Sequence, residues 1–247
     1  MIDQKNTKDA QTAGKNVYQY LRASIIGLQV KPGQIININE LSDFLKVSRS
    51  PIRDALIQLS KDGLVTTTPQ KGTIVSKIDI QRVRDERFMR SCIEERVLEE
   101  FLVSYHEKDI ERLKDLLRQQ KQALINKDAR DFLRTDDAFH TVFFEATNHP
   151  FCLENVLNMS SHYYRIRLLS LSESDIRTQT YEQHEEILRL IQEKNASKIR
   201  TLIEHHIVNK QDEETRMKRK YPDLFTAVEE SDQPKSRIWE EDFLKTV

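Results

Sequence analysis

Residues 47–56 read Val47-Ser48-Arg49-Ser50-Pro51-Ile52-Arg53-Asp54-Ala55-Leu56, and this stretch decides the fold. Ser48 is a residue type favoured as a helix N-cap, able to accept a hydrogen bond from the first turn. Pro51 lies early enough in the following helix that its missing N–H costs no hydrogen bond. Apolar residues then recur at i, i+3, i+4 and i+7, namely Ile52, Ala55, Leu56 and Leu59. This spacing predicts a helix that packs through one apolar stripe, with its arginines on the other faces.

A shorter amphipathic segment precedes this helix, with apolar residues at Ile38, Leu41, Phe44 and Leu45. Only two residues separate the segments, so the helices meet at a steep angle, as in a helix-turn-helix whose second helix enters the DNA major groove. Downstream, Gly63 is suited to end the helix. The β-branched runs 64–68 and 73–76 flank a turn at 69–72, which predicts a β-hairpin wing.

The run NELSDFLKVSRSPIRDALIQLSKDGLVTTTPQKGTIVS (39–76) closely resembles the winged helix of GntR-family bacterial transcription regulators. The alternative is a small helical module that only happens to carry surface arginines. It would make the helix cap, the turn, the wing glycine and both arginines coincidental matches to the GntR pattern. The resemblance implies that Arg49 reads a guanine edge and that Arg53 grips phosphate or base from the next turn. It further implies phosphate contacts from Ser48 and Ser50 and a wing contact from Lys71 and Gly72. Asn39 stands where many relatives carry a basic residue.

Length, charge and cysteine content limit the number of domains, the cellular location and the part of the chain that can contact DNA. The 247 residues suit one or two domains, and no transmembrane or secretory segment is visible, so a cytoplasmic protein with no membrane partner is expected. Two cysteines without CxxC spacing do not indicate a disulfide framework. Residues 1–77 carry 11 Lys/Arg against 6 Asp/Glu, whereas the remainder carries 28 against 34. Only the first domain is therefore expected to contact DNA.

The predicted fold class is mainly α, with an N-terminal winged helix-turn-helix and a C-terminal antiparallel helical bundle. We predict a frayed lead-in at 1–15, the winged domain at 16–77, a helical effector-binding and dimerisation domain at 78–220, and a tail at 221–247. In the winged domain a first helix starts near Val17 and ends before Pro32-Gly33, and Ile35-Ile36 adds a short strand. The second domain lacks glycine and divides into about six helices, with breaks at 108–109, 127–128, 148–150, 172–174 and 194–195.

Residues 79 to about 212 resemble the helical ligand-sensing domain, of the FCD type, found in the FadR subgroup of the GntR family. Arg90 with Glu94 resembles the subgroup's arginine-x-x-x-glutamate, and residues 136–140 (DDAFH) resemble its aspartate-x-x-phenylalanine-histidine. The corner 148–150 (NHP) matches loosely. Gln183-His184 departs from the subgroup's glutamate-histidine pair, because it keeps the histidine and loses the neighbouring carboxylate.

The spacing of Asp136, His140, His184 and His206 makes a metal site physically sensible. Asp136 and His140 are i, i+4 on one helix and face the same way. His184 and His206 lie at similar distances on either side of the predicted turn at Asn195, so an antiparallel hairpin brings them level. The set suits a divalent ion such as Zn²⁺, Ni²⁺, Mn²⁺ or Fe²⁺. Histidines on helices are also often surface or core residues. His205 lies about 100° from the metal face, and the remaining histidines are predicted in loops or at the surface: His106, His149 and His162.

The resemblance implies a small organic acid as effector, with arginines holding its oxygens, because guanidinium matches carboxylate in a bidentate fork. The candidates are Arg90, Arg165 and Arg167. For each alone, a solvated arginine or a structural salt bridge is an equal alternative. The predicted function is a ligand-responsive transcription regulator that binds an inverted-repeat operator in double-stranded DNA as a homodimer, with the first sensor helix (79–105) moving the winged domains. Two alternatives remain: a constitutive DNA-binding dimer without a ligand, and a metal-dependent hydrolase fused to a DNA-binding domain, although no further general acid or nucleophile motif is visible.

Overall fold

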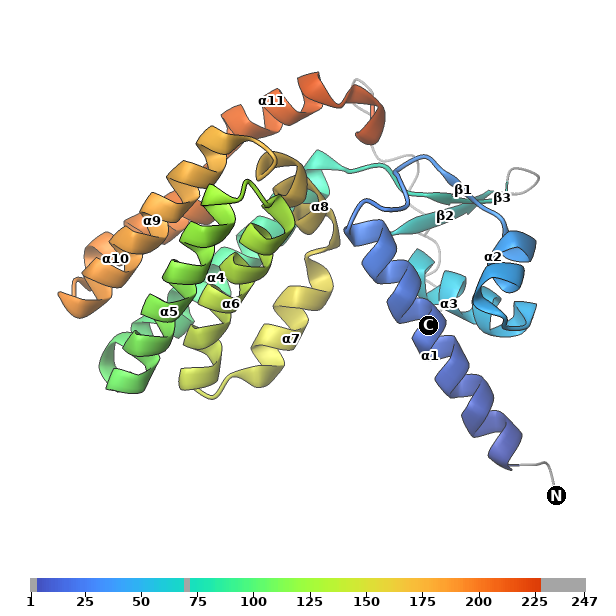
Figure 1. Cartoon of the computed structure of the whole chain (residues 1–247), viewed down its shortest axis with the longest axis horizontal. Helices are drawn as coiled ribbons and strands as arrows, with labels where there is room; N and C mark the ends of the chain where they lie inside the picture. Colours follow the sequence, from blue (N-terminus) through green and yellow to red (C-terminus); the bar gives the residue numbers. More distant parts are fainter. Residues whose placement is uncertain (1–3, 69–71, 228–247) are drawn as a thin grey trace, which may run out of the picture.

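The computed structural model describes residues 4–68 and 72–227, which form two bodies joined by a short linker (Figure 1). The N-terminal body contains three helices and a small sheet, and the C-terminal body contains only helices over its regular elements. No helix within the described ranges is both long enough and apolar enough to cross a membrane. The predicted mainly α fold class is confirmed.

The N-terminal body is a winged helix-turn-helix. Its helices are α1 (Gln4–Ile26), α2 (Ile38–Leu45) and α3 (Arg49–Lys61), and its strands are β1 (Ile35–Ile36), β2 (Val65–Thr68) and β3 (Gly72–Val75). The sheet is antiparallel in the order β1-β3-β2, so the β2–β3 hairpin forms the wing and β1 adds the predicted short strand. Residues 69–71 at the wing tip, including Lys71, lie outside the described residues.

Local chemistry explains the turn between α2 and α3. The Asn37 side chain caps α2 by accepting from the backbone N–H groups of Asn39 and Glu40, and Lys46 ends that helix in the left-handed conformation, with φ 55°. Gly63 has φ 73°, which glycine adopts without strain, and it closely follows the end of α3. The predicted apolar stripe of α3 is fully buried: Ile52, Ala55, Leu56 and Leu59.

Two local predictions in this body are corrected. Ser48 occupies the N-cap position of α3, but its side chain makes no capping hydrogen bond, which leaves the first-turn amides of this exposed helix end without that partner. Helix α1 begins at Gln4, so residues 4–15 are helical rather than frayed. Lysine, glutamine and alanine there have high helix propensity, and elongation from an existing helix needs no apolar contact.

The C-terminal body contains eight α-helices over the described residues, two more than predicted. They are α4 (Ile80–Ser104), α5 (Glu107–Ile125), α6 (Ala129–Ala146), α7 (Pro150–Met159), α8 (Ser161–Ser170), α9 (Ser174–Gln192), α10 (Ala196–Ile207) and α11 (Gln211–Lys220). The breaks near Ser160 and at 208–210 were not predicted. The predicted break at 108–109 lies inside α5, because Asp109 instead accepts from the His106 backbone N–H at 2.8 Å and caps the start of that helix.

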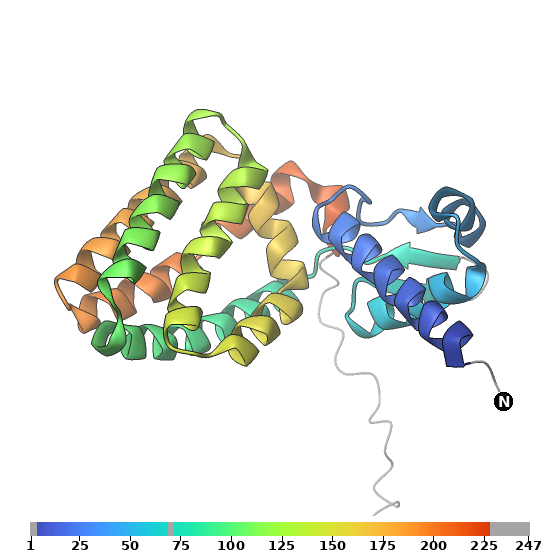
Figure 2. The same cartoon turned by 60° about the horizontal axis from the view of Figure 1, so that its bottom comes forward.

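Helix α4 packs against α6, α8 and α10, which lets it contact much of the body (Figure 2). Long pairs of neighbours, α5 with α6 and α9 with α10, complete the antiparallel arrangement. The core between them is aromatic at its centre, where the buried rings of Phe101, Phe139 and Phe143 meet edge to face or at steep angles. This packing fixes the inward faces of α4, α6, α9 and α10.

The linker between the two bodies is held by hydrogen bonds to the segment that follows α11. The segment after α11 contains the 3-10 helix η1 (Pro222–Leu224) and pairs in parallel with the linker through Ile78 and Phe225. The Ile78 N–H donates to the Leu224 carbonyl at 2.8 Å, and the Thr226 N–H donates to the Ile78 carbonyl at 3.0 Å. The first part of the predicted tail, residues 221–227, is therefore folded and hydrogen-bonds to the linker. The rest of the predicted tail, residues 228–247, lies outside the described residues.

Candidate metal centre and anion pocket

Three helices bring four buried ligand side chains to one point inside the C-terminal body. Helix α6 supplies Asp136 and His140, α9 supplies His184 and α10 supplies His206, the same four residues that the spacing selected. Nε2 of His206 lies 3.2 Å from Nε2 of both His140 and His184. Oδ1 of Asp136 lies 3.6 Å from Nε2 of His184. One donor atom from each of the four residues lies within 4.8 Å of all the others.

The outer nitrogen of each imidazole faces an oxygen acceptor. Nδ1 of His140 lies 2.7 Å from a carboxylate oxygen of Glu94. Nδ1 of His184 donates to Oε1 of Gln120 at 2.8 Å, and Nδ1 of His206 donates to Oε1 of Gln183 at 2.8 Å. An imidazole that donates from Nδ1 in its neutral form carries a lone pair at Nε2. The three Nε2 lone pairs therefore point into one small volume.

Burial keeps the site in the protonation state that a metal requires. It lowers the pKa of His184 to about 3 and the pKa of His206 well below its ordinary value, so both imidazoles are neutral near pH 7. Burial raises the pKa of the Asp136 carboxyl, but Arg167 and the nearby imidazoles outweigh that effect and lower its pKa to about 2. The cluster thus offers the neutral imidazoles of His184 and His206 together with the Asp136 carboxylate.

The residues fit a divalent metal ion. Nitrogens bound to one tetrahedral ion lie about 3.3 Å apart when each metal–nitrogen bond is about 2.0–2.1 Å, and the shorter Nε2 separations here are 3.2 Å. Converging lone pairs cannot hydrogen-bond one another, so a cation between them would remove a repulsion. The acceptors on Nδ1 match the outer hydrogen bonds that orient metal-bound histidines. The buried His/Asp cluster could therefore hold an ion.

A cationic pocket adjoins the cluster. Arg167 donates to Asp136 and, at 2.7 Å, to Asp137, while Nε of Arg90 donates to Glu94 at 2.6 Å. Arg87 lines the same pocket, and its Nε and Nη2 are buried without a hydrogen-bond partner in the described chain. Lys210 lines it too, and burial lowers the pKa of this amine. The cavity volume is about 30 Å³, so side chains must move before anything larger than water enters.

The three arginines predicted to hold an effector do not lie together. Arg90 and Arg167 line the pocket beside Asp136 and His140. Arg165 does not: it is fully buried at the joint between the two bodies, where Nη1 donates to the Ser76 carbonyl of the linker at 2.7 Å. The assignment of Arg165 as an effector ligand is corrected, because residues two apart on a helix point to different sides.

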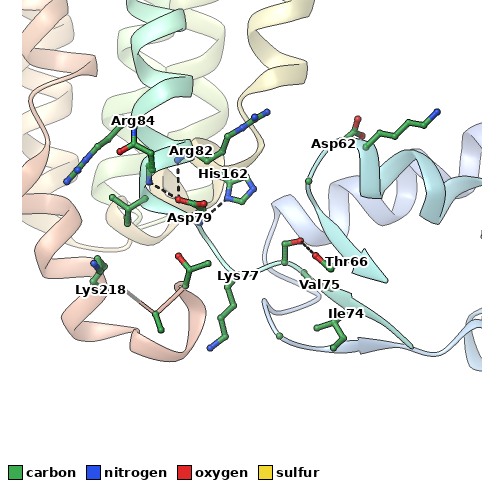
Figure 3. A pocket seen from close by; sticks show the side chains of 18 residues that line it. Asp62, Thr66, Ile74, Val75, Lys77, Asp79, Arg82, Arg84, His162 and Lys218 are labelled. Atoms are coloured by element: carbon green, nitrogen blue, oxygen red, sulfur yellow. Dashed lines mark hydrogen bonds between the residues drawn. The ribbon is translucent and has the colours of Figure 1, made fainter. Parts of the chain in front are cut away.

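The predicted loop or surface position of His162 is also wrong, because this residue is buried at the same joint. Its Nδ1 accepts from the Asp79 backbone N–H at 3.0 Å, next to the start of α4 (Figure 3). The buried Glu86 carboxylate accepts from the backbone N–H groups of His162 and Tyr163 at the start of α8. These contacts attach α8 to the linker and to α4. The interdomain cleft in Figure 3, of about 1340 Å³, lies beside them.

The other histidines are placed as follows. His205 is exposed, whereas its neighbour His206 is buried in the cluster, so the geometry favours His206 as the ligand. His106 is exposed before α5, and His149 is partly exposed, with Nε2 2.8 Å from a carboxylate oxygen of Glu100. None of these three, His205, His106 and His149, joins the cluster.

The predicted DNA-contacting residues that the structure describes are all exposed on the winged domain. Ser48, Arg49, Ser50 and Arg53 are exposed at the N-terminal end of α3, and Asn39 is exposed on α2. Gly72 is exposed at the start of β3 with φ 83°. No ion pair to Arg49 or Arg53 occurs within the described ranges, so both guanidinium groups are open to solvent. The N-terminal end of α3 thus presents two arginines and first-turn amides without a side-chain cap to solvent.

Several functional residues were not predicted from the sequence. Gln120 and Gln183 orient the imidazoles of His184 and His206, and nothing in their spacing pairs them with those particular histidines. Arg87 had a usable signal, because it lies three residues before Arg90 and therefore shares its helix face. Glu94 was identified only through its resemblance motif with Arg90, and nothing in the sequence indicated that its carboxylate contacts His140.

Comparisons with known proteins agree with both bodies. Residues 13–75 match the gntR family of bacterial regulatory proteins, and residues 87–209 match the FCD domain. An uncharacterized HTH-type transcriptional regulator in an unstable DNA locus of Streptomyces ambofaciens is 31% identical over 94% of this chain and 100% of its own length. The HTH-type transcriptional repressor RspR of Escherichia coli (strain K12) is 27% identical over 80% of this chain and 86% of its own.

Two solved structures share the fold. A GntR regulator from Rhodococcus sp. RHA1 has a TM-score of 0.68 at 17% identity, covering 83% of this chain and 97% of that one. Escherichia coli McbR/YncC has a TM-score of 0.66 at 17% identity, covering 85% and 98%. Family matches over both bodies and a relative similar over nearly the whole chain lead to one conclusion: the chain belongs to the GntR family of bacterial transcription regulators, with an FCD domain after its winged helix-turn-helix.

Proposed function

We propose that this regulator binds an operator as a homodimer and that a divalent metal ion together with a small carboxylate controls the binding. The observation that carries the proposal is the meeting of three Nε2 atoms and the Asp136 carboxylate beside a pocket lined by buried arginines. The family consists of transcription regulators, so the hydrolase alternative is set aside.

The DNA-reading part rests on α3. Arg49 and Arg53 are exposed at its N-terminal end, where a recognition helix meets base edges and phosphates. Ser48 and Ser50 are exposed beside first-turn amides, which favour phosphate oxygens. One such module offers few contacts, so two winged domains on an inverted repeat are needed for specific affinity.

In the sensor, Asp136, His140, His184 and His206 would hold the metal, which would supply a Lewis acid that a carboxylate can bind. The chain's own groups complete the site for an anion. Arg87 contributes two buried nitrogens without hydrogen-bond partners in the described chain, and Arg90 and Arg167 lie around the same pocket. The small cavity favours a compact acid, because each added carbon requires further side-chain movement.

Two helices connect this pocket to the DNA-binding domain. Helix α4 carries Arg87 and Arg90 and begins directly after Asp79 at the linker. Helix α8 carries His162 at its start, where it accepts from the Asp79 N–H, and Arg165 at its middle, which donates to the Ser76 carbonyl. Arg167 follows two residues after Arg165 and lines the pocket. An anion that draws Arg87 or Arg167 toward the metal would shift these helices relative to the linker. Such a ligand changes operator affinity only through unequal affinity for the two arrangements.

The first test is metal content, measured by elemental analysis of the full chain and of two variants. His206→Ala should lose the metal, whereas His205→Ala, which changes the exposed neighbour, should keep it. A thermal-shift screen of two-carbon to six-carbon carboxylates then identifies acids that stabilise the metal-loaded protein. Equal metal content in wild type and His206→Ala would contradict the assignment of the ligands.

The second test pairs operator affinity with and without a stabilising acid. Wild type and His205→Ala should respond to the acid, and His206→Ala should not, while its affinity without the acid stays near the wild-type value. Equal responses in wild type and His206→Ala would remove the metal from the control mechanism. A metal-stripped wild type with unchanged operator affinity and no thermal shift with any acid would support the constitutive dimer instead.

A further inference from the structure

A further cavity lies at the junction of the two bodies and shares no lining residue with the metal centre or with the cleft in Figure 3. Its volume is about 430 Å³, within the range of small-molecule sites, whereas the pocket at the metal cluster has about 30 Å³. One wall comes from α1 of the winged domain, and the others come from α6, α7 and α8 of the sensor. Much of this lining is apolar, and includes Ala23, Ile26, Leu133, Ala138, Leu157 and Leu168.

Two arginines at this cavity keep an uncompensated positive charge. Nη2 of Arg22 donates to the carbonyls of Leu157 and Asn158 at 3.1 and 3.2 Å, and Nη2 of Arg130 donates to the Gly27 carbonyl at 2.9 Å. Neither guanidinium has a carboxylate within 4.0 Å in the described part of the chain. Arg134, on the same helix as Arg130, differs in this respect because its charge is paired with Asp131 at 2.8 Å.

The one carboxylate in the cavity wall is already paired. Asp137 accepts from Arg167 at 2.7 Å, and Arg167 also donates to Asp136. The cavity therefore combines an apolar surface with two guanidinium groups that retain N–H donors and net positive charge. Backbone carbonyls fix one nitrogen of each guanidinium, so the groups are already oriented for an anion.

We propose that this junction cavity binds an amphipathic monoanion, a compact apolar body carrying one carboxylate, as a second ligand distinct from any acid at the metal centre. The apolar body would lie against the leucine-rich wall, and the carboxylate would accept from Arg22 and Arg130. Because the site takes its walls from both bodies, a bound molecule stabilises the domain arrangement in which α1 faces the walls formed by α6, α7 and α8.

The test uses 2-naphthoate as the probe and isothermal titration of the full chain with its metal in place. We expect saturable binding at one site per chain and much weaker binding of the matched cation 2-(aminomethyl)naphthalene. Arg130→Gln should weaken the binding about tenfold or more, because a charged hydrogen bond is lost. Arg130→Lys should retain most of the affinity, and Arg134→Gln should retain all of it.

Two further variants show where the probe binds: one fills the junction cavity and the other removes a proposed metal ligand. Ala23 is exposed on α1, so Ala23→Phe should fold normally while occupying the cavity and abolishing binding. His206→Ala should leave binding unchanged, since the cavity does not include His206. Absence of binding, equal binding of the aminomethyl compound, or binding that survives both Arg130→Gln and Ala23→Phe would overturn the proposal. Binding lost in His206→Ala and kept in Arg130→Gln would place the probe at the metal centre and also overturn it.

Discussion

A carboxylate oxygen of Glu94 lies 2.7 Å from Nδ1 of His140, and this contact decides which nitrogen of His140 faces the metal centre. An ionised carboxylate has no proton to donate, so this separation favours the His140 tautomer with its proton on Nδ1 and its lone pair on Nε2. Glu94 is held in turn by Nε of Arg90 at 2.6 Å. Burial raises the pKa of Glu94, but Arg90 and His140 together outweigh that effect and lower it to about 2. Arg90, which lines the pocket beside the cluster, thus orients the proposed metal ligand His140 through one carboxylate.

Replacing Glu94 by glutamine should weaken metal binding by about 10–100-fold, the usual effect of losing such an outer partner. The side-chain amide introduced by Glu94→Gln can donate to Nδ1, which would let the imidazole carry its proton on Nε2. Competition with a chromophoric chelator measures the affinity, and circular dichroism verifies the fold. Glu99→Gln, at a more exposed site on the same helix, is the control and should leave the affinity unchanged. Equal affinity in wild type and Glu94→Gln would show that His140 needs no carboxylate partner.

Features encoded over a few residues could be predicted from the sequence. The α2–turn–α3 unit follows from the apolar spacing of its two helices and from Gly63, which closely follows the end of α3 with φ 73°. Asp136 and His140 share a helix face at i, i+4, and His184 and His206 are brought level by the α9–α10 hairpin. Each inference needed only the geometry of one helix or of one short connection.

Features set by packing between distant helices could not be predicted in the same way. Gln183 precedes His184 but orients His206, because the hairpin places its side chain against the other helix. The helix breaks near Ser160 and at 208–210 contain no glycine or proline, so no strong local signal marks them. The misplacement of Arg165 was avoidable, since Arg165 and Arg167 lie roughly 200° apart around their helix and cannot both face one pocket.

Operator discrimination should depend on Arg49 more than on any other exposed residue of α3. A bidentate contact from arginine to a guanine edge is worth about 1–3 kcal/mol of discrimination, so Arg49→Ala should relax specificity at one position in each half-site. The measurement is the ratio of affinities for operator and scrambled DNA at fixed salt. Lys61→Ala, at the opposite end of α3, is the control and should preserve the ratio. An unchanged ratio for Arg49→Ala would contradict its assignment as a base-reading residue.

The operator should be a short inverted repeat bound by two chains. A symmetric dimer doubles the contacts of one winged domain and requires half-sites of matching symmetry. Analytical sedimentation at micromolar concentration should give a dimer both free and on DNA, and separating the half-sites by about five base pairs, roughly half a helical turn, should greatly weaken binding. A monomer in both states, or indifference to half-site spacing, would contradict the prediction.

The joint between the bodies should become less stable as the pH falls, and His162 should account for a measurable share of the loss. Burial, reinforced by the nearby Arg165 guanidinium, lowers the pKa of His162 to about 4, and its Nδ1 accepts from the Asp79 N–H only while unprotonated. The unfolded chain has the ordinary histidine pKa of about 6.5. Between about pH 6.5 and 4 the unfolded state therefore binds the extra proton, so the free energy of unfolding falls with falling pH, by up to about 3 kcal/mol from this group.

The check is urea unfolding at a series of pH values for wild type and His162→Gln. Glutamine can still accept from the Asp79 N–H but does not titrate, so the variant should lose less stability between about pH 6.5 and 4. His184 and His206 also have lowered pKa values and destabilise the protein in the same direction. Their contribution is common to both proteins, so the difference between the two pH profiles isolates His162. Identical profiles would mean that His162 keeps an ordinary pKa in the folded protein and that its contact with Asp79 does not hold the joint.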